Sequence, residues 1–126
     1  MIQTLFQVAL GGALGASARY LAGVAVLRQF GSHDFPLGVI TVNVLGSFLM
    51  GALVVFLGHK GLTHWNAFLA TGVLGGFTTF SSFSLETWRL MSEGRYDLAG
   101  LYVGLSVLVS IFALIAGVAL MRAVLV

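Results

Sequence analysis

The sequence predicts an all-α integral membrane protein, with four transmembrane helices that form a single domain over residues 1–126. Three observations lead to this fold class. Hydrophobic residues make up 59% of the chain and charged residues only 8%, whereas a soluble domain carries roughly 25% charged residues. The mean hydropathy is +1.05. Four long apolar segments follow one another with short polar breaks between them, so we expect no soluble appendage.

Each apolar segment is long enough to cross a bilayer, which takes about 20 mostly apolar residues in a helix. The predicted spans are residues 5–27, 37–57, 65–88 and 98–121. The first segment lacks the basic start of a signal peptide and is too long to be one, so we expect it to remain as a permanent helix.

The three breaks cover residues 31–36, which include the only proline, and residues 58–61 and 92–97. They are too short to fold by themselves, so consecutive helices should run antiparallel. Trp65, Trp88 and Tyr96 lie near segment ends, where aromatic residues gather at the membrane interface.

The basic residues of the loops give almost no bias in membrane orientation. Lys60 and Arg122 lie on the side of the termini, and Arg28 and Arg95, with Arg89 if it is counted, lie on the other. Since basic loops normally set the orientation, two interpretations stay open. Either the topology is fixed by other means, or the chain inserts both ways and pairs as an antiparallel dimer. The small interior of four short helices favours an oligomer in both cases.

Small residues recur three or four positions apart in every segment, a spacing that lets helix backbones approach closely. We expect these positions to serve helix packing. The pairs are Gly11/Gly15, Ser47/Gly51, Gly72/Gly76 and Gly100/Gly104.

A polar side chain lies well inside the second span. Asn43 shares a helix face with Ser47, one turn later. An amide at such a depth forms a hydrogen bond to another helix or contributes to a polar path, and the sequence leaves both interpretations open.

The middle of the third span is expected to break its helix. Gly75 and Gly76 are followed by five hydroxyl residues within the next eight positions. A break at this depth leaves carbonyl groups that lipid cannot satisfy, so protein, water or a cation must do so. The alternative is a kinked helix whose carbonyls are satisfied by the threonine and serine side chains.

Phe80 and Phe83 lie on one face of the third span. Paired phenylalanines in a membrane normally face lipid or pack against helices. Their setting among hydroxyl residues suggests a second interpretation, since ring edges carry partial positive charge. Beside amide and hydroxyl donors, such edges would suit a small anion.

The last span carries a polar stripe of Tyr102, Ser106 and Ser110 at helical spacing. These hydroxyl groups either line a polar path or bond back to carbonyls of their own helix. Arg19, deep in the first span, is expected to anchor the structure by reaching the interface, a cluster of carbonyls or Glu86.

Several classes of function are not indicated. Apart from Arg19 and Glu86, no ionisable residue lies clearly within a span, and His33, His59 and His64 fall in breaks. Cysteine is absent, and no catalytic triad, nucleotide loop or metal-ligand spacing occurs. A net charge of +2 without a basic cluster argues against binding of nucleic acid. We expect the protein not to be an enzyme.

Three motifs together resemble the Fluc (CrcB) family of fluoride channels. They are GGALGASARY at residues 11–20, TVNVLGSF at residues 41–48 and GGFTTFSSFSLE at residues 75–86. The third motif is highly specific, and the resemblance extends over the whole chain, including the four spans and the lengths of the loops.

The resemblance implies a dual-topology homodimer in a bacterial-type plasma (inner) membrane, with two antiparallel pores that pass fluoride out of the cell and no other protein partner. It further implies a central structural sodium ion, held by the backbone carbonyls of Gly75 and Thr78 from both subunits. Phe80 and Phe83 would form a phenylalanine box, and Arg19 and Glu86 would have structural or electrostatic roles. The expected pore residues are Asn43, Phe80, Phe83, Thr79, Tyr102, Ser106 and Ser110.

The residues leave two other functions open. A small dual-topology multidrug exporter needs a carboxylate within the membrane, for which Glu86 is the candidate. A subunit that only packs against other helices would explain the glycines, but it would leave Asn43 and the polar stripe without a role.

Overall fold

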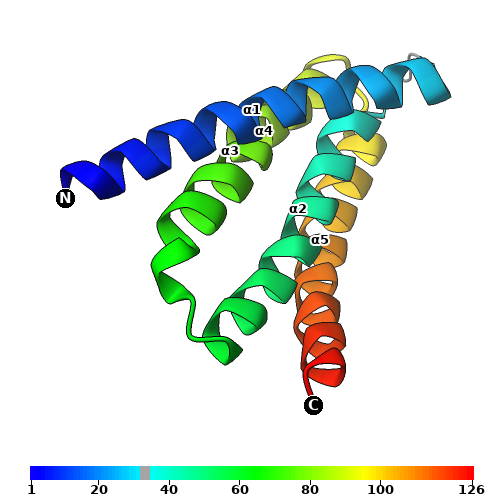
Figure 1. Cartoon of the computed structure of the whole chain (residues 1–126). Coiled ribbons are helices and arrows are strands. Elements are labelled where there is room, and N and C mark those ends of the chain that lie inside the picture. Colours follow the sequence, from blue (N-terminus) through cyan, green and yellow to red (C-terminus); the bar gives the residue numbers. More distant parts are fainter. Residues whose placement is uncertain (32–34) are drawn as a thin grey trace.

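The computed structural model describes residues 1–31 and 35–126, and it consists of helices joined by short connections (Figure 1). Four stretches are long and apolar enough to cross a membrane. Each predicted span is confirmed and extends by about a turn or less beyond its predicted ends. The centre of the first break, which includes His33, lies outside the described residues. The elements are α1 (Ile2–Phe30), α2 (Leu37–His59), η1 (Thr63–Trp65), η2 (Ala67–Leu74), α3 (Gly75–Phe77), α4 (Phe80–Ser92) and α5 (Tyr96–Val124).

The ends of the helices follow from their local sequence. Pro36 immediately precedes α2, and its fixed φ suits the start of a helix. Gly31, Gly61 and Gly94 follow α1, α2 and α4 with φ values of 76°, 67° and 75°. This left-handed backbone conformation is one that glycine adopts without steric cost.

The helices pack as two pairs that diverge from one end of the molecule. In Figure 1, α2 and α5 run side by side, while α1 packs along η2 and α3. A Cβ atom at Gly11 would overlap the Phe68 carbonyl, and one at Gly51 would overlap the Leu114 carbonyl. The predicted role of these glycines in close helix packing is confirmed.

One pair of glycines does not follow that prediction. An added Cβ at Gly100 or Gly104 would meet nothing within 4 Å. The packing prediction is therefore wrong for this pair within the single chain, because none of the described residues packs closely against these two positions of α5.

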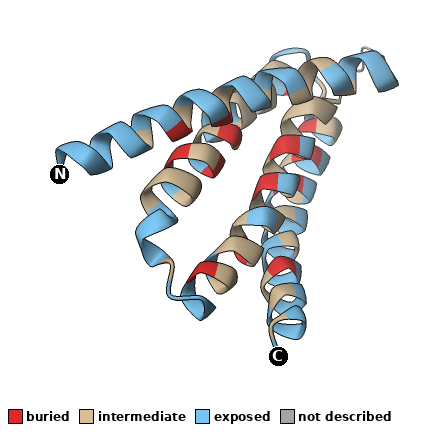
Figure 2. Cartoon of the chain, in the orientation of Figure 1, coloured by how far each residue is buried: buried red, intermediate tan, exposed pale blue. Residues whose placement is uncertain are grey.

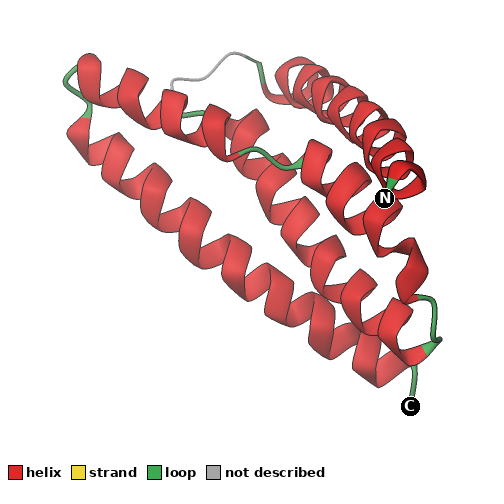
Figure 3. Ribbon diagram, turned by 90° about the vertical axis from the view of Figure 1, so that its left-hand side faces the viewer, coloured by secondary structure: helices red, strands yellow, loops and turns green. Residues whose placement is uncertain are grey.

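The third span is broken, as predicted. It starts with the short 3₁₀ helix η1 and continues through a π-helical stretch, η2, and the short helix α3. Thr78 and Thr79 then adopt extended backbone conformations, with φ/ψ of −87°/158° and −150°/118°, before α4 begins. Figure 3 shows this interruption as a short loop within the span.

The core lies at the end of the molecule where α2, α4 and α5 meet. Leu90 and Tyr102 are completely buried, and Phe35 and Phe83 pack against them. Elsewhere, exposed residues cover most of α1 and α5, while most residues of α2 and η2 are half-buried (Figure 2). Many of the exposed residues are large apolar side chains such as Phe112, which is 66% exposed. Their counterparts are lipid or a second protein chain.

Candidate functional site

The amide of Asn43 pairs with the broken backbone of the third span. Its Nδ2 donates to the Thr79 carbonyl at 3.0 Å, and its Oδ1 accepts from the Thr79 N–H at 2.8 Å. The helix-to-helix hydrogen bond considered for Asn43 is therefore present. Since the oxygen must face the N–H of Thr79, the orientation of the amide is fixed. The second N–H of Nδ2 stays beside the groove described below.

Arg19 reaches the same break from α1. Its Nε donates to the Gly76 carbonyl at 3.1 Å. Of the three partners considered for Arg19, the carbonyl cluster is thus the observed one. The alternative with Glu86 is wrong, because the Glu86 carboxylate pairs with Arg89, three residues later on α4, at 2.9 Å.

Two further carbonyls at the break lose their helical donors. In a continuous α-helix, the N–H of Thr79 would bond to Gly75 and the N–H of Ser82 to Thr78. The Thr79 N–H donates to Asn43 instead, and the Ser82 N–H donates to Thr79 Oγ1 at 3.1 Å. The carbonyls left without these bonds belong to Gly75 and Thr78, the residues expected to hold a cation.

Hydroxyl groups satisfy part of the break, as the kinked-helix alternative required. Thr78 Oγ1 donates to the Leu74 carbonyl at 3.0 Å, and Thr79 caps the first turn of α4. Ser84 Oγ bonds back to the Phe80 carbonyl at 3.0 Å. Hydroxyl groups, Asn43 and Arg19 therefore together satisfy backbone groups at the break. None of the hydrogen bonds named above ends on the carbonyl of Gly75 or Thr78.

A groove of about 340 Å³ runs beside the break, between α2, α4 and α5. It brings together six of the seven expected pore residues, and none of the residues that line it is charged. The six are Asn43, Thr79, Phe80, Phe83, Ser106 and Ser110.

The polar stripe of α5 has no hydrogen-bonding partners in the described part of the chain. The Tyr102 hydroxyl, Ser106 Oγ and Ser110 Oγ are all buried and unbonded. The alternative in which they bond to their own helix is therefore wrong. A buried polar group without a partner costs about 1–3 kcal/mol, which indicates that the stripe serves something outside this chain.

Three aromatic rings lie next to one another at this site. The ring centroids of Phe80 and Phe83 are 5.4 Å apart, and those of Phe83 and Tyr102 are 5.3 Å apart. Tyr102 does not line the groove but lies directly behind Phe83. Phe80 is 78% exposed on the single chain, so its ring borders the open side of the groove.

The groove also contains residues outside the expected pore set. Ser47 lines it from the helix face that it was expected to share with Asn43. Gly46 lines it too, and a Cβ atom there would overlap the side chain of Thr78. Gly46 thus lets α2 approach the break.

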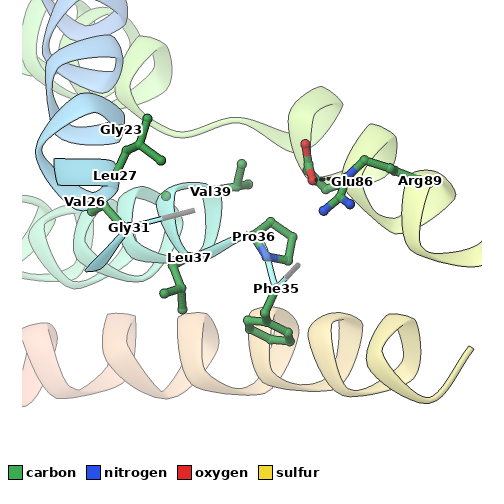
Figure 4. Close-up of a pocket in the computed structure, with 11 residues that line it drawn as sticks. Gly23, Val26, Leu27, Gly31, Phe35, Pro36, Leu37, Val39, Glu86 and Arg89 are labelled. Carbon is green, nitrogen blue, oxygen red and sulfur yellow. Dashed lines mark hydrogen bonds and ion pairs between the residues drawn. The ribbon is translucent and has the colours of Figure 1, made fainter. Parts of the chain in front are cut away.

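A second pocket, of about 470 Å³, lies where the end of α1 and the start of α2 approach α4 (Figure 4). Leu27, Phe35 and Val39 line it, together with the Glu86–Arg89 ion pair. Arg89 also contacts Glu93 at 3.3 Å.

Comparisons with known proteins identify the relatives of this chain. A family model described as CrcB-like protein, camphor resistance (CrcB), matches residues 6–118. A protein of Ruegeria sp. (strain TM1040) named fluoride-specific ion channel FluC is 59% identical, over 99% of both chains. Proteins with the same name from Cereibacter sphaeroides (strain ATCC 17029 / ATH 2.4.9) and Caulobacter vibrioides (strain NA1000 / CB15N) are 59% and 50% identical. These alignments cover 97% of both chains for the former, and 95% of this chain and 96% of the relative for the latter.

Proposed function

The chain belongs to the CrcB family, and on this premise we propose that it is a fluoride-selective channel that lets cytoplasmic fluoride leave the cell passively. The observation that carries the proposal is the composition of the groove. An oriented amide, buried hydroxyl groups without partners and phenylalanine rings meet there, and no carboxylate lines it. Such a lining offers donors to an anion and has no fixed charge to retain it.

The chemical difficulty for a fluoride channel is dehydration of the ion. The remaining N–H of Asn43 and the hydroxyl groups of Ser106 and Ser110 can replace water as donors. Edges of the Phe80 and Phe83 rings add weaker positive potential. Since this lining is held by the helices and by the Asn43–Thr79 pair, little reorganisation is needed when the ion arrives.

Passive flow is sufficient for export. Neutral hydrogen fluoride enters cells from acidic surroundings, ionises at cytoplasmic pH and is trapped as fluoride. An inside-negative potential favours exit of the anion by about 2.3 kcal/mol per 100 mV. No coupling ion is needed, so the lack of a proton-relay carboxylate in the groove agrees with the proposal.

The active form in this proposal is an antiparallel homodimer with two pores. A single chain leaves Phe80 exposed and the groove open on one side, so a second copy can complete the lining. The nearly balanced basic residues of the two membrane faces support insertion in both orientations.

A structural sodium ion belongs to the same proposal. The Gly75 and Thr78 carbonyls have lost their helical donors, and two copies of each would supply hard oxygen ligands for a small cation. Bound there, sodium would supply positive charge that satisfies these carbonyls and fixes the break. The ion is not transported in this scheme.

The multidrug-exporter alternative is weaker on structural grounds. Its mechanism needs a carboxylate within the membrane that is free to exchange protons and cations, and Glu86 is paired with Arg89 at 2.9 Å.

Bacterial cells without a fluoride exporter of their own provide the first test. Expression of this chain should restore growth in acidic medium that contains fluoride, and it should lower cytoplasmic fluoride. The proposal would be contradicted if cells with the chain in their membrane accumulated as much fluoride as cells without it.

A further inference from the structure

A row of glycines on α1 brings Arg19 to the helix break. Gly11, Gly15 and Arg19 are spaced four residues apart, so they share one face of the helix. A Cβ atom at Gly15 would overlap the Val73 carbonyl, and one at Gly11 would overlap the backbone of η2. The two glycines therefore let α1 lie directly against the third span (Figure 1). At the next position of the row, the Nε atom of Arg19 reaches the Gly76 carbonyl at 3.1 Å.

The guanidinium of Arg19 has no carboxylate partner in the described part of the chain. The ion pairs found there join Arg89 to Glu86 and Glu93. Among these residues, the bond to the Gly76 carbonyl is the one hydrogen bond that the Arg19 side chain makes. A charged side chain within a span is costly and normally serves a function. For Arg19, that function is to be sought at the helix break.

The bond from Arg19 ends next to one of the two carbonyls that the proposed sodium ion would use. Gly75 and Gly76 are consecutive residues, and glycine has more backbone freedom than any other residue. The Gly76 carbonyl lies in the short helix α3, directly before the break, where carbonyls have no donor in a following turn. Because Arg19 fixes the direction of the Gly76 carbonyl, it also restricts the carbonyl of Gly75 before it.

Asn43 restricts the other carbonyl in a similar way. The Thr79 N–H, which donates to Asn43 Oδ1 at 2.8 Å, belongs to the same planar peptide group as the Thr78 carbonyl. The direction of the Thr78 carbonyl is therefore fixed from α2. Side chains of two different helices thus restrict the two carbonyls that each chain would offer to the ion.

On the basis of the sodium ion in the proposed function, we propose that Arg19 is a positioning residue for that ion. Arg19 holds the last turn of α3 so that the Gly75 carbonyl keeps the direction that a cation requires. It acts through its hydrogen bond to the Gly76 carbonyl and not through its positive charge, which would repel sodium. The glycine row of α1 belongs to the same device, because it sets the distance between Arg19 and the break.

Two substitutions of Arg19 separate the hydrogen bond from the charge. In Arg19→Gln, the amide nitrogen takes the place of the Nε atom, so the hydrogen bond can remain while the charge is lost. Arg19→Met has a methyl group at that place and loses both. Thermal unfolding of the purified protein in detergent is measured while sodium replaces N-methylglucamine at constant ionic strength. The quantity compared is the sodium concentration that gives half of the full stabilisation.

We expect Arg19→Met to raise this concentration by about tenfold, as for the loss of a hydrogen bond from a charged donor, while Arg19→Gln raises it by less than about threefold. High sodium should restore most of the melting temperature of Arg19→Met. A lower melting temperature with an unchanged sodium requirement would show a general structural role and would overturn the proposal. An equal increase in both variants would overturn it too, because it would assign the effect to the charge.

A second variant leaves Arg19 in place and moves the helix that carries it. Gly15→Ala must shift α1 away from the Val73 carbonyl, so it should raise the sodium requirement as well. Gly12→Ala is the matched control on α1, since an added Cβ would meet nothing within 4 Å there, and it should leave the requirement unchanged. An unchanged requirement in Gly15→Ala would contradict the proposal. The parent chain separates this failure from a failure of the proposed sodium site, because without that site sodium would not stabilise the parent either.

Discussion

Asn43 and Thr79 form a two-way hydrogen-bonded pair, in which one side chain satisfies both the N–H and the carbonyl of a residue at the helix break. The pair joins the centre of α2 to the third span. It also fixes which end of the amide faces the groove, since the oxygen is committed to the Thr79 N–H. A single residue thus stabilises the break and orients a donor for an anion.

The Asn43→Asp variant tests that pair. The carboxylate would place an oxygen against the Thr79 carbonyl and a negative charge beside the groove. Fluoride efflux should fall at least a hundredfold, and the unfolding free energy should fall by about 1–3 kcal/mol as the bond to the Thr79 carbonyl is lost. Asn66→Asp, the same chemical change at an exposed position before η2, is the control. Equal efflux from both variants would show that Asn43 does not contribute to the fluoride path.

The hydroxyl groups of Ser106 and Ser110 should matter for transport and not for stability. Both are buried and unbonded within the described chain, so Ser106→Ala and Ser110→Ala remove no hydrogen bond from the protein. We expect fluoride efflux to fall about tenfold while the melting temperature stays the same or rises. A large loss of stability with normal efflux would mean that the stripe bonds to protein in the dimer.

Gly46 should be intolerant of any side chain. A Cβ atom there would overlap the methyl group of Thr78, so Gly46→Ala must shift either the Thr78 side chain, which donates to the Leu74 carbonyl, or α2 itself. Overpacking of this kind costs about 1–3 kcal/mol. Gly58→Ala in the same helix is the control, since an added Cβ would meet nothing within 4 Å there. Thermal unfolding that ranks Gly58→Ala as equally destabilised would contradict this account.

Removal of sodium should destabilise the break. If two copies of the Gly75 and Thr78 carbonyls hold the ion, replacing sodium by N-methylglucamine should lower the melting temperature of the reconstituted dimer. Millimolar sodium should restore it, whereas caesium, which is much larger, should not. The same melting temperature in all three salts would show that these carbonyls do not bind sodium.

Much of the fold could be predicted because a helix that crosses a membrane needs a long apolar segment. Hydropathy located all four spans, and two adjacent glycines followed by hydroxyl residues located the break. The spacing of Tyr102, Ser106 and Ser110 identified a polar stripe, and the structure adds that its hydroxyl groups have no partners within the chain.

Other features depend on contacts between distant segments, which a single sequence does not specify. The pairing of Asn43 with Thr79 joins residues 36 positions apart, and that of Arg19 with Gly76 joins residues 57 positions apart. Phe35 lies in a connection without helical periodicity, so nothing in the pattern linked it to Tyr102. The pair of Glu86 and Arg89 was not predicted, although two opposite charges three residues apart on a helix are a signal for such a pair.

Efflux of ions from liposomes loaded with potassium fluoride or potassium chloride tests the central claim most directly. Valinomycin lets potassium leave together with the anion, so no membrane potential builds up to stop the efflux. An ion-selective electrode should then record rapid loss of fluoride and no loss of chloride through the reconstituted dimer. Retention of fluoride by liposomes that contain folded dimer would contradict the account. Equally fast loss of chloride would contradict it too, since it would mean that the groove does not distinguish the two ions.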